Sequence, residues 1–198
     1  MDLDTGRYGP TGRRLPPSEG IAAGGGLSGV LAGGAMMLTL MTVSASLGQG
    51  FWTPLELVGG TLLGLNAVLG GFWAGAVGLA LHLSASAAWG MLFASLLSRE
   101  TTAGQAFWSG LVYGVAVWAV MTYIGLPVLD RTMEPRVNLI QGAWFACHLL
   151  YGACLAWTPA LRRRWLEALG EYPAYVYRPV RGDGLVVERG TPVGVAER

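Results

Sequence analysis

The first long apolar stretch of the chain, residues 27–47, reads LSGVLAGGAMMLTLMTVSASL and contains no charged side chain. A transmembrane helix needs about 20 mainly apolar residues. The chain has four stretches of this kind, and none carries Asp, Glu, Arg or Lys in its central part. We therefore predict an all-α integral membrane protein with a transmembrane domain over residues 21–160. Its four predicted spans are 25–47, 71–97, 105–128 and 137–160.

The composition of the 198 residues agrees with this prediction. Only 13% of the residues are charged, whereas a soluble domain carries roughly 25%. All 13 basic residues are arginine and the net charge is +1, which leaves no basic surface dense enough to bind nucleic acid. The composition excludes an ordinary soluble protein, a disordered chain and a nucleic-acid-binding protein.

Arginines near the ends of the spans predict the orientation in the membrane, because cytoplasmic loops carry an excess of positive side chains. Arg131 and Arg136 fall on one side of the membrane and seven arginines on the other. We expect the second side to be the cytoplasm, which places a cytoplasmic arm at residues 1–20 and a cytoplasmic tail at 161–198. The seven are Arg7, Arg13, Arg14, Arg99, Arg162, Arg163 and Arg164.

Two segments outside the spans carry signals of local structure. Thr53-Pro54-Leu55-Glu56 predicts a helix start with Thr53 as N-cap and Glu56 at N3. We expect a short interfacial helix within residues 48–70, with a re-entrant loop as the less common alternative. In the tail, Gly182-Asp183-Gly184 indicates a tight turn and hence a small hairpin between residues 175–181 and 185–189.

The first and third spans resemble each other. Residues 28–35 read SGVLAGGA and residues 109–116 read SGLVYGVA, and a Met-Thr pair follows in both copies. A histidine then lies in the middle of the next span of each copy. We predict two tandem helix hairpins related by a pseudo-twofold axis along the membrane normal. The aligned pairs Gly29/Gly33 and Gly110/Gly114 are small-xxx-small motifs, which allow helices to pack closely.

Three features together resemble the YagU-type small bacterial inner-membrane proteins. They are the glycine-rich third span with Pro127 at its exit, the pair His82 and His148, and the run Arg162-Arg163-Arg164 after the last span. The resemblance covers about residues 70–165. It implies a multi-pass protein of the bacterial inner (cytoplasmic) membrane, and it carries no catalytic residues over to this chain.

The two histidines are the main candidates for chemistry. We expect His82 and His148 at similar depth in the second and fourth spans, where polar groups are costly and by default mark function. They would then be able to ligate one haem b, or another tetrapyrrole, from both faces, with Tyr151 and Gln141 as further contacts. The glycine motifs compete with this hypothesis if the first and third spans meet at the centre. In the simpler interpretation each histidine bonds a neighbouring helix through Thr39, Thr42, Thr122 or a backbone carbonyl.

Three functions follow, in order of preference. The first is a non-catalytic subunit of a larger membrane complex, for which a bioenergetic assembly is the favoured kind; its partners would be lipids and other membrane subunits. The second is a small bis-histidine haem protein; a proton or quinone site is a separate interpretation of the two histidines. The third is an oligomeric transporter or channel. We expect no metal site other than a haem iron, and we expect Arg162, Arg163 and Arg164 to contact lipid or a partner.

Overall fold

The computed structural model describes residues 20–64, 71–98, 101–129, 140–168, 175–178 and 186–189. The predicted N-terminal arm before Gly20, most of the C-terminal tail and the start of the predicted fourth span, residues 137–139, lie outside these residues. So do six of the arginines used to predict the orientation: Arg7, Arg13, Arg14, Arg99, Arg131 and Arg136.

Three helices are long and apolar enough to cross a membrane. The first, Ala22–Ser46, combines a π-helical turn, η1 (Ala22–Gly26), with α2 (Leu27–Ser46). The second is α4 (Phe72–Leu96). The third, Ala103–Leu129, joins α5 (Ala103–Val120), the π-helical turn η3 (Met121–Gly125) and α6 (Leu126–Leu129). The ends of these three helices lie within three residues of the ends of the predicted spans 25–47, 71–97 and 105–128.

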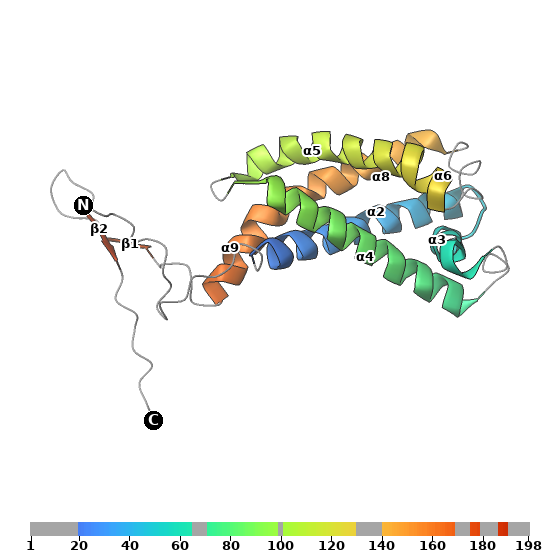
Figure 1. Ribbon diagram of the computed structural model, residues 1–198, viewed down its shortest axis with the longest axis horizontal. Coiled ribbons are helices and arrows are strands. Elements are labelled where there is room, and N and C mark those ends of the chain that lie inside the picture. The colour runs from blue at the N-terminus through green and yellow to red at the C-terminus, as the bar shows by residue number, and fades with distance from the viewer. Residues whose placement is uncertain are drawn as a thin grey trace, which may run out of the picture.

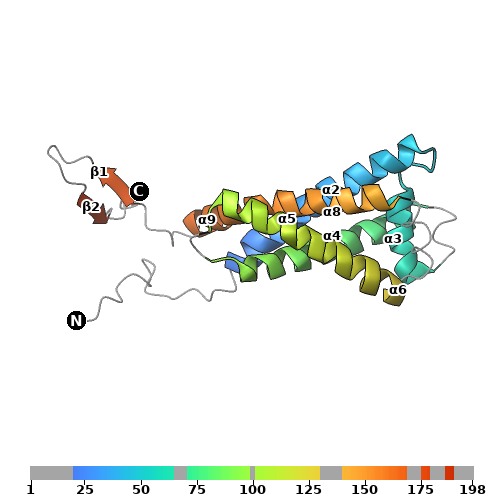
Figure 2. The same cartoon turned by 90° about the horizontal axis from the view of Figure 1, so that it is seen from above.

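A further helical segment consists of three consecutive pieces. These are α8 (Gln141–Cys154), the 3₁₀ turn η4 (Leu155–Trp157) and α9 (Thr158–Ala168). The 3₁₀ turn precedes Pro159, whose ring would clash with the carbonyl of Leu155 in a regular α-helix and which cannot donate a backbone hydrogen bond. In both views α8 lies beside α5 along the long axis of the bundle, and α9 lies at one end of it (Figures 1 and 2).

The connection after α2 forms a helix, α3 (Thr53–Leu63), which lies across the ends of the long helices (Figures 1 and 2). The prediction of Thr53 as its N-cap is wrong. The N-cap residue is Trp52, and the Thr53 hydroxyl instead donates to the carbonyl of Gln49 at 2.6 Å. A capping box does form at α5, where the Thr102 side chain accepts from Gln105 N and the Gln105 side chain accepts from Thr102 N.

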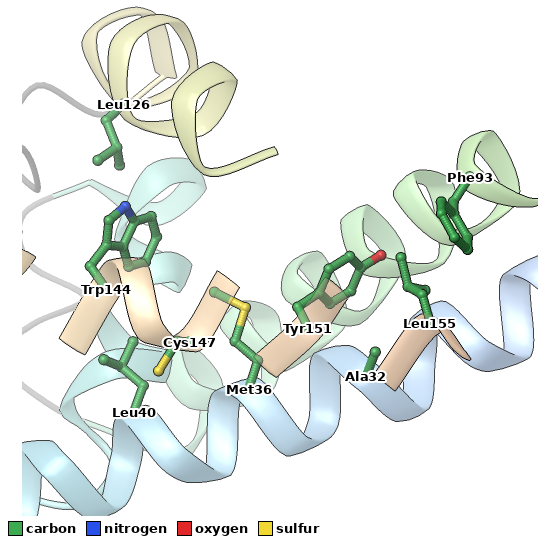
Figure 3. Packing of buried hydrophobic residues seen from close by; sticks show 9 residues of the cluster. All are labelled: Ala32, Met36, Leu40, Phe93, Leu126, Trp144, Cys147, Tyr151 and Leu155. Atoms are coloured by element: carbon green, nitrogen blue, oxygen red, sulfur yellow. The ribbon is translucent and has the colours of Figure 1, made fainter. Parts of the chain in front are cut away.

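The core lies mainly between α2 and α8. Figure 3 shows Met36 and Leu40 of α2 facing Cys147 of α8, with Trp144 reaching toward Leu126 of α6. Cys147 and Cys154 lie seven residues apart on α8, and both are free thiols. In the tail, β1 (Tyr175–Arg178) and β2 (Val186–Arg189) pair antiparallel, with Tyr175 opposite Arg189.

We predict that Gly78→Val destabilises the protein. A Cβ at Gly78 would overlap the backbone carbonyl of Leu55, so α3 would have to move away from α4. Overpacking of this kind costs about 1–3 kcal/mol, which a thermal unfolding curve in detergent would detect. Gly75→Val is the matched control, because a Cβ there meets no atom within 4 Å. Equal unfolding midpoints for the two variants would contradict the contact between α3 and α4.

Candidate functional site

The backbones of α2 and α4 touch at glycine. A Cβ at Gly29 would overlap the carbonyl oxygen of Ser86, and a Cβ at Gly90 would overlap the carbonyl oxygen of Gly25. Gly33 lies against the side chain of Ser86, one turn further along α2. Both glycines of the first predicted motif therefore face α4, the next long helix in the chain, because only glycine permits so short a distance between helix axes.

The second motif also makes backbone contacts, between α5 and α8. A Cβ at Gly110 would overlap the carbonyl oxygen of Gly152, and one at Gly114 would overlap that of His148. The two motifs thus pack within successive helix pairs. They do not bring α2 and α5 together, so the predicted competition between the motifs and a central cofactor does not arise at these glycines.

His82 connects two helices. Its Nε2 lies 3.0 Å from the carbonyl oxygen of Gly33 on α2. A carbonyl oxygen can only accept, so Nε2 of His82 carries the hydrogen. In the neutral ring, Nδ1 then holds the lone pair.

His148 has the opposite arrangement. Its Nδ1 lies 2.8 Å from the carbonyl oxygen of Trp144, one turn earlier on the same helix. The His148 ring lies edge-on to the Trp144 indole, with the two ring centroids 4.5 Å apart. Nδ1 of His148 therefore carries the hydrogen and Nε2 holds the lone pair. The two histidines also lie at different distances along their helices from the contacting glycine. His82 precedes Gly90 by two helical turns, and His148 precedes Gly152 by one.

Tyr151 joins this group of side chains and Gln141 does not. The Tyr151 hydroxyl donates to the carbonyl of Ser86 on α4 at 2.7 Å, and both residues are buried. Gln141 is the exposed first residue of α8, and it lies about 10 Å along the helix axis from His148.

The threonines proposed as histidine partners bond elsewhere. Thr39 and Thr42 donate to carbonyls one turn back in their own helix. Thr122, in the π-helical turn η3, accepts the indole N–H of Trp144 at 2.9 Å. The predicted partners of the histidines were threonine hydroxyls or backbone carbonyls. Both histidines bond backbone carbonyls.

Sequence reasoning missed further polar contacts between helices. The Tyr113 hydroxyl of α5 donates to the carbonyl of Trp89 on α4 at 2.8 Å. Within the described part of the chain, the indole N–H of Trp118 is buried without a hydrogen-bond partner, and its ring lies edge-on to Phe145. Ser86 was within reach of sequence analysis, because it lies one turn from His82 on the same face of α4.

The three arginines of the predicted lipid or partner site lie on α9, at the opposite end of the bundle from α3 (Figure 1). Arg163 and Arg164 are exposed. The backbone and Cβ of Arg162 lie against Gly24 of η1.

We predict that Gly29→Ala lowers the thermal stability and that Gly34→Ala does not. A methyl group at Gly29 meets the Ser86 carbonyl, whereas one at Gly34 meets nothing within 4 Å. Thermal unfolding of both variants in the same detergent should separate them by about 1–3 kcal/mol. A stable Gly29→Ala protein would contradict the backbone contact of α2 with α4.

We also predict opposite tautomers for the two histidines. In ¹⁵N-labelled protein, His82 should be protonated at Nε2 and His148 at Nδ1, because those nitrogens face carbonyl oxygens. Ring nitrogen chemical shifts distinguish the two forms, and a His148→Phe variant leaves the His82 signal alone for assignment. The same tautomer in both rings would contradict one of the two hydrogen bonds.

The arrangement has a definite chemical capacity. Its hydroxyl, indole and imidazole N–H groups hold helices together, and each neutral histidine keeps one lone pair that can accept a hydrogen bond or bind a metal. Comparisons with protein-family models, with curated proteins and with solved structures found no match to this chain.

Proposed function

We propose that the chain is a non-catalytic integral membrane subunit of a larger membrane complex, of which a bioenergetic assembly is the favoured kind. The observation that carries the proposal is how the polar side chains between the helices are used. His82, Tyr113 and Tyr151 each bond a backbone carbonyl of another helix. Such bonds fix the positions of helices, which is what a scaffold subunit requires.

Four spans in two tandem hairpins form part of the proposal. The segment of α8, η4 and α9 covers Gln141–Ala168, and it runs alongside α5 with backbone contact at Gly110 and Gly114. Its residues 141–160, which precede the arginines, reach about 30 Å, the thickness of the hydrocarbon core of a bilayer. The paired contacts, α2 with α4 and α5 with α8, support a duplicated hairpin with an axis along the membrane normal.

The interfacial position of α3 is also proposed. Its direction across the bundle end fits a helix in the plane of the membrane surface (Figure 2). Exposed aromatic pairs flank it, Phe51 with Trp52 and Phe72 with Trp73. Aromatic side chains of this kind favour the membrane–water interface.

The favoured location is the bacterial inner membrane, with both termini in the cytoplasm. The arginine distribution of the sequence supports this orientation. Phe107 and Trp108, an edge-on pair near the start of α5, would form the aromatic belt of the cytoplasmic side.

A surface for a neighbouring subunit is available on α5. This helix packs one face against α8, while its Trp108 and Val112, and Tyr123 of the adjoining turn η3, are strongly exposed. An exposed apolar face of this kind can be covered by lipid or by another transmembrane helix. In the proposed complex, this exposed face of α5 contacts the next subunit.

A bis-histidine haem protein is the second candidate. It is favoured by His148, whose Nδ1 bond to the Trp144 carbonyl leaves Nε2 for a ligand, as in most metal-ligating histidines. The Nε2 of His82, in contrast, is bonded to Gly33. A haem held by both Nε2 atoms would have to break that bond, which ranks this candidate below the scaffold.

Purification from native membranes tests the proposal. We expect the tagged full chain, extracted in a mild detergent, to elute with other membrane subunits in a defined ratio. A photo-crosslinker at exposed Val112 should join it to one of them, and the control at buried Val117 should not. Elution as a free protein without a crosslink would contradict the proposal. A Soret band in the eluate that His82→Ala and His148→Ala both abolish would replace it with the haem protein.

A further inference from the structure

One face of the last helix carries side chains suited to a membrane surface. Trp157 of η4 and Leu161, Arg164 and Trp165 of α9 follow the spacing that places residues on one side of a helix. Trp157 is 54% exposed and Trp165 is 47% exposed, and Arg164 between them is also exposed. The face therefore alternates aromatic rings with a guanidinium group.

This face is held in place by the rest of the protein. The Thr158 hydroxyl at the start of α9 lies 2.7 Å from the Ser28 hydroxyl of α2, and both residues are buried. Ser28 also donates to the carbonyl of Gly25 at 3.0 Å, and the hydroxyl of Thr158 is therefore the donor in the bond between the two residues. Arg162 packs against Gly24 on the same side. These contacts hold α9, and with it the three arginines, at the end of the bundle next to the start of α2.

The charge on this helix is positive. The sequence of α9 contains three arginines and a single acidic residue, Glu167. A guanidinium group binds phosphate through two parallel hydrogen bonds, and tryptophan prefers the level of the lipid headgroups. A charged face beside exposed tryptophans at the end of a transmembrane bundle meets the membrane surface, where phosphate is the abundant anion.

We propose that α9 is a binding surface for the headgroups of anionic phospholipids, with the exposed Arg163 and Arg164 as the phosphate ligands. Arg164 lies between the interfacial anchors Trp157 and Trp165, and Arg163 lies on the adjoining exposed side of the helix. This surface is separate from the proposed role as a subunit. It would couple the stability of the bundle to lipid composition, because a ligand that binds only the folded form stabilises it.

The test uses the full chain in a neutral detergent, titrated with the anionic lipid POPG or the zwitterionic lipid POPC. We expect POPG to raise the thermal unfolding midpoint and POPC to have little effect. The double variant Arg163→Gln/Arg164→Gln should need about thirty-fold more POPG for half of the maximal shift, from about 1 kcal/mol per basic residue at an anionic surface. Glycerol phosphate should not replace POPG, because it offers the tryptophans no interface.

Two variants control for charge and for folding. Arg178→Gln/Arg189→Gln removes the same charge from the strands of the tail and should respond to POPG as the unmodified protein does. Arg163→Lys/Arg164→Lys keeps the charge and should retain most of the response. An equal response to POPG and POPC, or an unchanged response of the glutamine variant, would overturn the proposal. Loss of a co-purifying protein from the glutamine variant, with POPG binding unchanged, would assign the surface to that protein instead.

Discussion

Within a bilayer, apolar side chains gain little from leaving lipid for protein, so helices associate through close packing and interhelical hydrogen bonds. In this protein the close packing depends on glycine. Gly29 and Gly90 bring α2 against α4, and Gly110 and Gly152 bring α5 against α8. At larger separations His82 would not reach the Gly33 carbonyl. The bond from His82 to Gly33 therefore depends on the glycine contacts between α2 and α4.

Much of the helical architecture could be predicted because hydropathy and length are local properties of the sequence. The bounds of α4 were predicted to within one residue at each end, and those of the first and third spans to within three. The start of α3 was predicted wrongly, since Thr53 has a competing acceptor in the carbonyl of Gln49, which the sequence does not reveal. The breaks before Pro127 and Pro159 follow from proline chemistry that is visible in the sequence.

The candidate site was only partly predictable, because it depends on which helices pair and in what register. Sequence similarity aligns Gly29 with Gly110, yet by its contacts Gly29 corresponds to Gly114. A Cβ at Gly29 would meet the carbonyl oxygen of Ser86, four residues before Gly90, and a Cβ at Gly114 would meet that of His148, four residues before Gly152. One helical turn of difference separates these two alignments. By the contact alignment Ser86 corresponds to His148, so two histidines that match in sequence hold different positions in the packing.

The bond between Ser28 and Thr158 joins the first long helix of the chain to the beginning of its last helix, across 130 residues. Ser28 is synthesised 130 residues before Thr158, so this hydrogen bond cannot form until the later residue has been made. A nascent chain that stops before residue 158 lacks this bond, so the contact between the start of α2 and the start of α9 forms only after residue 158 has been made.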